Sequence, residues 1–299
     1  MTLSPKQWVL LTALISGCSV YYNSIAVKGL DPVGFAMVKN LLATVVLAGI
    51  VLLAGTWKQF ANLKKEQWLQ ILAIAIIGGS IPFALFFGGL SIASSTASGS
   101  FIYRLMFIFS ALMAVAFLRE RGNLKTAAGV GLILMANLAI LLTINAFSFG
   151  LGELMVLAAT LMWSAENILL KKTLAWLSPD ALAASRLGMG GIILLAAMAM
   201  MAPAGLASIA VMPLLPLLIS ALFILGFTMT YYRGLAGTTI TEATAILTLG
   251  GLVSALLPAV LSSKLPGALE SVSLVMIAMG AGLVLTSRPG PQANASPGV

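Results

Sequence analysis

The feature that most constrains this chain is a series of apolar stretches, each about as long as a membrane is thick. The hydrocarbon core of a bilayer is about 30 Å thick and takes about 20 helical residues to cross. Ten stretches fit this length, and we number them helix 1 to helix 10: Trp8–Val27, Pro32–Ala54, Trp68–Leu90, Ser94–Leu118, Leu124–Thr143, Gly150–Leu170, Ala181–Ala202, Leu214–Leu235, Thr241–Leu261 and Ala268–Thr286. We therefore predict an all-α integral membrane protein with ten transmembrane helices.

Composition supports this fold class and excludes others. Only 8% of the 299 residues are charged and 60% are apolar, whereas soluble domains are about 25% charged. The chain has no His, one Cys and no glycine-rich phosphate loop, so we predict no metal, no cofactor and no enzyme activity. The net charge of +8 does not indicate a nucleic-acid partner, because the cations gather in short loops, a pattern that reports membrane orientation.

Counting the cations by side predicts that orientation. Lys28 and Lys264 fall on one side, whereas eleven fall on the side that holds both termini: Lys6, Lys58, Lys64, Lys65, Arg119, Arg121, Lys125, Lys171, Lys172, Arg233 and Arg288. Both termini are therefore expected in the cytoplasm, with the chain in the inner (plasma) membrane. The last residues, 288–299, are rich in Pro, Gly and Asn and are predicted to be a disordered cytoplasmic tail.

The two halves of the sequence resemble each other at nearly one offset. The matches are Ser110–Leu118 with Ser254–Ser262 at 144 residues, Pro32 and Lys39 with Pro179 and Arg186 at 147, and Phe86–Leu90 with Tyr231–Leu235 at 145. We predict a first repeat over 1–143 and a second over 144–287. Because each repeat has five spans, an odd number, the second must be inverted relative to the first.

Specific residues then point to a family. Helices 1 and 2 carry Gly17, Asn23, Lys28, Pro32 and Lys39, and helices 6 and 7 repeat the pattern with Trp163, Asn167, Lys171, Pro179 and Arg186. Helix 4 opens with the small residues Ser94–Ser100 and ends in Arg119-Glu120-Arg121. On these residues the chain resembles the EamA-type ten-helix permeases of the drug/metabolite transporter superfamily. It lacks that family's proline midway along helices 4 and 9, with Met106 and Gly250 near those places, and Lys264 replaces the second terminal glutamate.

The resemblance implies a secondary active transporter that exports a small metabolite or amino-acid-like solute by alternating access. Its partners would be that solute, the lipid bilayer and either protons or a counter-solute, and it would act as a monomer or homodimer. Two alternatives stay open, an importer or antiporter of anionic metabolites and a membrane scaffold without transport activity.

Ionisable residues inside the spans are the first candidates for a site, since each costs about 2.5–3.5 kcal/mol to insert. At 1.5 Å per residue, Glu166 and Arg186 lie at one level in neighbouring helices, about 8 Å from the cytoplasmic surface. Either they form a structural ion pair or Glu166 carries a proton or cation. Lys39, about 10 Å from the outer surface, completes this set of coupling or ion-pair candidates.

Arg104 lies about 15 Å into helix 4, at the bilayer centre, with no carboxylate expected at its level. Either helix carbonyls and water or an anionic group of the solute must compensate its charge. Tyr22, Tyr103 and Trp163 lie deeper than interface anchors do. Together with Arg104, these aromatic residues and the amides Asn23 and Asn167 form the predicted substrate-binding set.

Overall fold

The fold was examined in a computed structural model that describes residues 3–94, 96–142, 149–201, 206, 209, 212–262 and 267–287. Within these ranges the regular elements are all helices, and ten spans are long and apolar enough to cross a membrane. The prediction of an all-α protein with ten transmembrane helices is confirmed. The predicted tail at 288–299 and the predicted repeat boundary at 143/144 lie outside the described residues.

The spans keep the predicted order, and three of them consist of two helices each. The first half holds helix 1 as α1 (Pro5–Ala26), helix 2 as α2 (Pro32–Leu53), helix 3 as α3 (Lys65–Ile77) and α4 (Ile81–Ile92), helix 4 as α5 (Thr96–Arg104) and α6 (Met106–Leu118), and helix 5 as α7 (Leu124–Leu141). The second half holds α8 (Leu151–Thr173), α9 (Pro179–Met201), α11 (Leu214–Gly237), α12 (Ile240–Leu247) with α13 (Leu249–Ser262), and α14 (Ala268–Leu285). A 3₁₀ helix, η1 (Thr56–Asn62), links α2 to α3.

Helix starts follow local chemistry. The Ser4 side chain accepts a hydrogen bond from the Gln7 backbone N–H, and the Asp31 side chain accepts one from Gly34. Each of these two caps is followed by a proline, whose missing N–H and fixed φ suit the first helical position. Large apolar side chains such as Leu53, Val45 and Val260 are 92%, 72% and 80% exposed. That much exposed hydrocarbon is what lipid contact requires.

The breaks in helices 3, 4 and 9 differ from the uninterrupted stretches read from the sequence. Helix 4 breaks at Leu105, whose N–H bonds to Ile102 O three residues back, and helix 9 breaks at Thr248, whose N–H bonds to Ala245 O. Both breaks lie within two residues of Met106 and Gly250. Both helices are thus interrupted by one i−3 hydrogen bond without a proline at the break.

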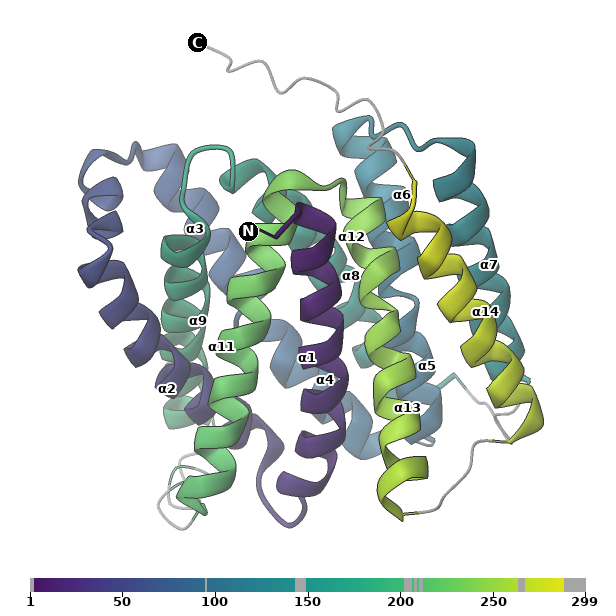
Figure 1. The fold of residues 1–299 in the computed structure, drawn as a ribbon. Coiled ribbons are helices and arrows are strands. Elements are labelled where there is room, and N and C mark those ends of the chain that lie inside the picture. The colour runs from purple at the N-terminus through teal and green to yellow at the C-terminus, as the bar shows by residue number, and fades with distance from the viewer. Residues whose placement is uncertain are drawn as a thin grey trace.

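The packing of the helices shows the inverted repeat. Helix α1 packs against α11 as α8 packs against α4, and α2 contacts α11 as α9 contacts α3 (Figure 1). At the contact of α7 with α14, a Cβ on Gly129 would lie 2.5 Å from Gly280 O, so glycines let these backbones touch. The Lys6 ammonium lies 2.9 Å from Ser287 O, which puts both ends of the described chain on one face. We call this the terminal face and the opposite one the far face.

The topology can be tested by cysteine labelling. With Cys18 replaced by alanine, a cysteine at Asn62 on the terminal face should react with an impermeant maleimide only after the membrane is opened. A cysteine at Lys28 on the far face, the matched control, should react in intact cells. This result follows from the bias of cations toward the cytoplasm. The reverse labelling pattern would place the termini outside.

Candidate functional site

The gap between α3 and α4 is the centre of the candidate site. Gly78, Gly79 and Ser80 separate the two helices, and α4 then starts with a proline at its second position. A Cβ built on Gly78 would lie 1.9 Å from the Glu166 carboxylate. The φ of Gly78 is −120°, which other residues also adopt, so this position needs glycine for space rather than for backbone conformation.

Glu166 of α8 and Arg186 of α9 meet in this gap. The Arg186 Nε donates to Glu166 Oε1, and its Nη2 donates to Glu166 Oε2 at 2.9 Å and to the Gly78 carbonyl at 3.0 Å. Glu166 is 3% and Arg186 8% exposed. The two hydrogen bonds between guanidinium and carboxylate, together with the bond to the Gly78 carbonyl, stabilise buried charges that lipid could not solvate. A pair on the second half thus holds the broken helix of the first half.

An aromatic cluster lies beside this pair. Trp163 donates its indole N–H to the same Gly78 carbonyl at 3.1 Å, and its ring centroid lies 5.6 Å from that of Tyr103. The ring centroids of Phe83 and Phe86 each lie 5.4 Å from that of Trp163. These edge-to-face and tilted ring contacts join α4, α5 and α8, so Tyr103 and Trp163, two of the predicted substrate-binding residues, lie together.

Asn167 continues the polar contacts across the halves. Its Nδ2 donates to Ser110 Oγ of α6 at 3.1 Å, and its Oδ1 accepts from the Tyr231 hydroxyl of α11 at 2.9 Å. One turn earlier, the Ser164 hydroxyl donates to Met106 O at 3.3 Å, next to the break in helix 4. Helix α8 therefore contacts both broken helices of the first half through polar groups.

Arg104 is separate from these contacts. Glu270, in the first turn of α14, is the carboxylate whose charge acts on Arg104. The expectation that no carboxylate lies level with Arg104 in the bilayer stays a prediction. Among the described residues Arg104 makes no hydrogen bond that would fix its guanidinium.

The remaining predicted residues lie elsewhere. Tyr22 packs on Phe223 with ring centroids 5.8 Å apart, and the side-chain Oδ1 of Asn23 accepts from the Ser220 hydroxyl at 2.6 Å. Both contacts join α1 to α11, away from the Glu166–Arg186 pair. Lys39 is also apart from it, with its ammonium 5.9 Å from the centre of the Phe35 ring.

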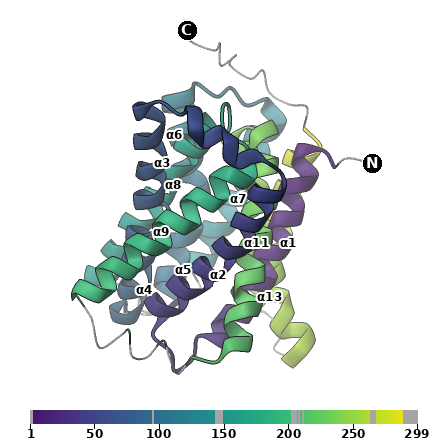
Figure 2. The same cartoon turned by 90° about the vertical axis from the view of Figure 1, so that its left-hand side faces the viewer.

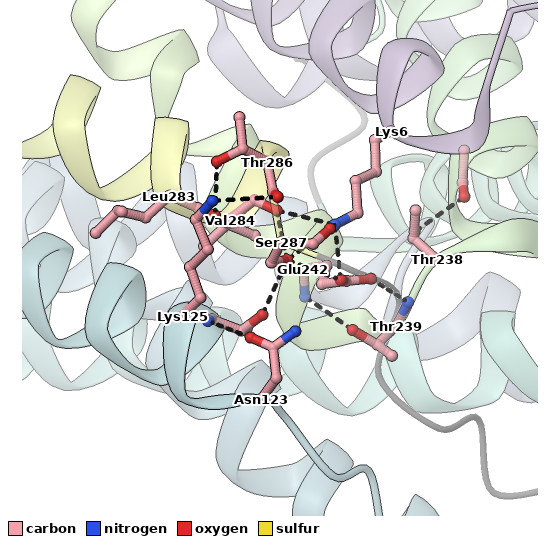
Figure 3. A network of polar contacts seen from close by, with 12 residues as sticks. Lys6, Asn123, Lys125, Thr238, Thr239, Glu242, Leu283, Val284, Thr286 and Ser287 are labelled. Atoms are coloured by element: carbon pink, nitrogen blue, oxygen red, sulfur yellow. Dashed lines mark hydrogen bonds and ion pairs between the residues drawn. The ribbon is translucent and has the colours of Figure 1, made fainter.

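A second polar cluster lies at the terminal face. Lys6 Nζ lies 2.9 Å from Glu242 Oε1 and 3.0 Å from Ser287 Oγ, and Thr126 Oγ1 lies 3.1 Å from the same hydroxyl (Figure 3). Glu120 adds to it, because its carboxylate accepts from the N–H groups of Ile240 and Thr241 at 2.7 and 3.1 Å. The starts of α1, α7 and α12, the end of α14 and the segment after α6 are thus joined.

Sequence reasoning did not include Gly78, Ser110 or Glu270 in the site. Gly78-Gly79-Ser80 is a run of three small residues in the middle of an apolar span, and such runs mark close approach of another helix. Glu270 was visible as a carboxylate near the start of helix 10. Ser110 has no signal of its own, because a lone serine in a span usually bonds to its own helix.

Ten spans in two inverted halves, with buried charges at the contact between the halves, define the architecture of a membrane transporter. A model of the EamA-like transporter family matches residues 5–142 and again 150–286. The chain belongs to this family, and it is a multi-pass membrane transporter.

Individual relatives are more distant. A protein of Archaeoglobus fulgidus named "Uncharacterized transporter" is 26% identical over 193 residues, which cover 62% of this chain and 63% of that protein. The match thus spans less than two thirds of that relative. A solved structure titled "Crystal structure of protein" superposes with a TM-score of 0.77 at 15% identity, covering 95% of this chain and 98% of that one. At this identity the likeness concerns the fold alone.

Proposed function

We propose that the chain is a secondary active transporter that exports a small amphiphilic or amino-acid-like solute across the inner membrane by alternating access. A proton gradient or exchange with a counter-solute drives it. The observation that carries the proposal is the Glu166–Arg186 pair, a buried charged group contributed by one half and bound to a helix break of the other. Inverted-repeat transporters use broken helices at the contact between repeats for solute binding.

The chemistry beside this pair supports the solute class. Trp163, Tyr103, Phe83 and Phe86 offer an apolar, aromatic surface next to two formal charges. A solute with one charged end and one apolar end would complement both parts.

Polar contacts at the two faces support alternating access. Lys6 in α1 and Glu153 in α8 are equivalent positions at the offset of 147. Lys6 binds Glu242 at the start of helix 9 on the terminal face, and Glu153 accepts from the Ser94 N–H at 2.8 Å on the far face, just before α5. The repeat thus supplies a polar contact to each face, and in alternating access the contacts of one face break while those of the other persist.

Transport in proteoliposomes tests the proposal. Purified protein with an imposed pH gradient should accumulate one or more radiolabelled L-amino acids above equilibrium, with saturable kinetics. A proton ionophore should abolish accumulation unless the driving force is exchange, in which case preloaded unlabelled solute restores uptake. Protein-free liposomes are the control, and intact cells expressing the protein should lose preloaded label faster. Non-saturable flux, or movement of phosphorylated anions alone, would contradict the proposal.

A further inference from the structure

Lys39 is a buried cation without a counter-ion. It lies in α2, is 8% exposed, and within the described ranges it has no ion pair and no hydrogen bond from its ammonium. The ring of Phe35, 5.9 Å away, is the one favourable electrostatic contact that the structure gives it. An ammonium in this position is costly unless something else supplies negative charge.

Asn40, the next residue, is also unsatisfied. Its side chain is fully buried, and neither Nδ2 nor Oδ1 has a partner among the described residues. Leaving both a donor and an acceptor of one amide unpaired is unusual, because each buried polar atom without a partner costs about 1–3 kcal/mol. Two adjacent residues of α2 thus offer a positive charge, a hydrogen-bond donor and an acceptor, all unused.

The inverted repeat shows which partner is missing. The offset of 147 that relates Lys39 to Arg186 also relates Ser19 to Glu166. Arg186 therefore has its carboxylate on the neighbouring helix, whereas the equivalent position of α1 holds Ser19, whose hydroxyl accepts from Asn23 Nδ2 at 3.0 Å. The second repeat carries an anion at this position, and the first repeat does not.

A polar contact between α1 and α11 lies at the depth of Lys39. Phe35, one turn before Lys39, packs in one cluster with Leu217 of α11 and with Val27, next to the end of α1. One turn deeper on those two segments lie Ser220 and Asn23, joined by the 2.6 Å hydrogen bond. Lys39 is therefore level with a polar contact between α1 and α11, on the far-face half of the membrane.

We infer that Lys39 and Asn40 bind the carboxylate end of an α-amino or α-hydroxy acid. The carboxylate pairs with the Lys39 ammonium and accepts from Asn40 Nδ2, and the ammonium or hydroxyl on the α-carbon donates to Asn40 Oδ1. A ligand of this class uses all three free groups at once. The inference rests on the proposed function, since it assigns part of the solute site.

Ligand-induced thermal stabilisation of the purified full-length protein tests this site. The probes are the twenty common L-amino acids, L-lactate and L-malate, each amino acid being compared with the amine that lacks its carboxylate. At least one acid should raise the melting temperature of the wild type, and its amine should not. Lys39→Met should weaken binding of that acid about tenfold or more, yet raise the melting temperature without ligand, because an unpaired charge has been removed.

Three variants complete the test. Lys39→Arg, which keeps the charge, should retain part of the affinity, and Lys28→Met, an exposed lysine on the same face, should behave as wild type. Asn40→Leu should also weaken binding and raise the unliganded melting temperature. The inference is wrong if no acid stabilises the wild type, if Lys39→Met binds the acid unchanged, or if Lys39→Met and Asn40→Leu both lower the unliganded melting temperature. Transport of another solute by Lys39→Met would leave the proposed function standing, whereas a wild type that transports nothing removes both.

Discussion

Glu166→Gln and Arg186→Leu are each expected to destabilise the protein by about 3–5 kcal/mol, whereas the double variant should lose less than the two single losses added together. Each single change leaves one buried group, either the guanidinium or the carboxylate, without its partner. The double change removes both formal charges. Unfolding of the purified protein in detergent, measured over the full double-mutant cycle, gives the coupling free energy.

Asp180 and Arg233 provide a matched control. Their ion pair is also a direct contact, at 2.7 Å, but their side chains are 17% and 30% exposed. Exposed pairs contribute about 0–1 kcal/mol, so Asp180→Asn and Arg233→Leu should have small effects. Additive losses for Glu166 and Arg186 would reject the pair. If Glu166→Gln instead keeps normal stability, abolishes gradient-driven transport and spares exchange, Glu166 is the coupling group.

The transmembrane spans and the contact between Glu166 and Arg186 could be predicted, because both follow from the thickness of the bilayer and the rise per residue of a helix. An apolar run has to match the bilayer, and 1.5 Å per residue places two charges of one helical hairpin at the same depth. The same arithmetic places Cα atoms and ignores side-chain reach, so it did not indicate that the Glu270 carboxylate of α14 acts on the charge of Arg104.

The helix breaks could not be predicted from the sequence, for another reason. Gly78-Gly79-Ser80 is compatible with a continuous membrane helix, since small residues are common there. The break is stabilised by groups from α8 and α9, because Trp163 and Arg186 both donate to the Gly78 carbonyl. A carbonyl released from its own helix needs such donors, and which distant residues supply them depends on tertiary packing. In Figure 2, α9 runs obliquely across the bundle, and it packs against α3.

Gly78→Ala is expected to destabilise the protein, and to reduce transport, more than alanine at any other glycine of the site. The new Cβ would lie 1.9 Å from the Glu166 carboxylate, and the nearest atoms are those of a charged group held by two bonds to Arg186. Overpacking alone costs about 1–3 kcal/mol. Displacing the carboxylate would add the cost of an unpaired Arg186. Thermal unfolding in detergent and transport in proteoliposomes should both show the loss.

Gly131→Ala isolates the steric cause. Gly131 lies inside α7, and a Cβ there would meet nothing within 4 Å, so alanine should be neutral or stabilise by about 0.5–1 kcal/mol through helix propensity. Combining Gly78→Ala with Glu166→Gln and Arg186→Leu sharpens the test. Without the charged pair the added methyl has no ion pair to disrupt, so its cost should fall to that of overpacking or less. If Gly78→Ala is as harmless as Gly131→Ala, the carboxylate does not occupy the gap in helix 3, and the arrangement that underlies the proposed site is wrong.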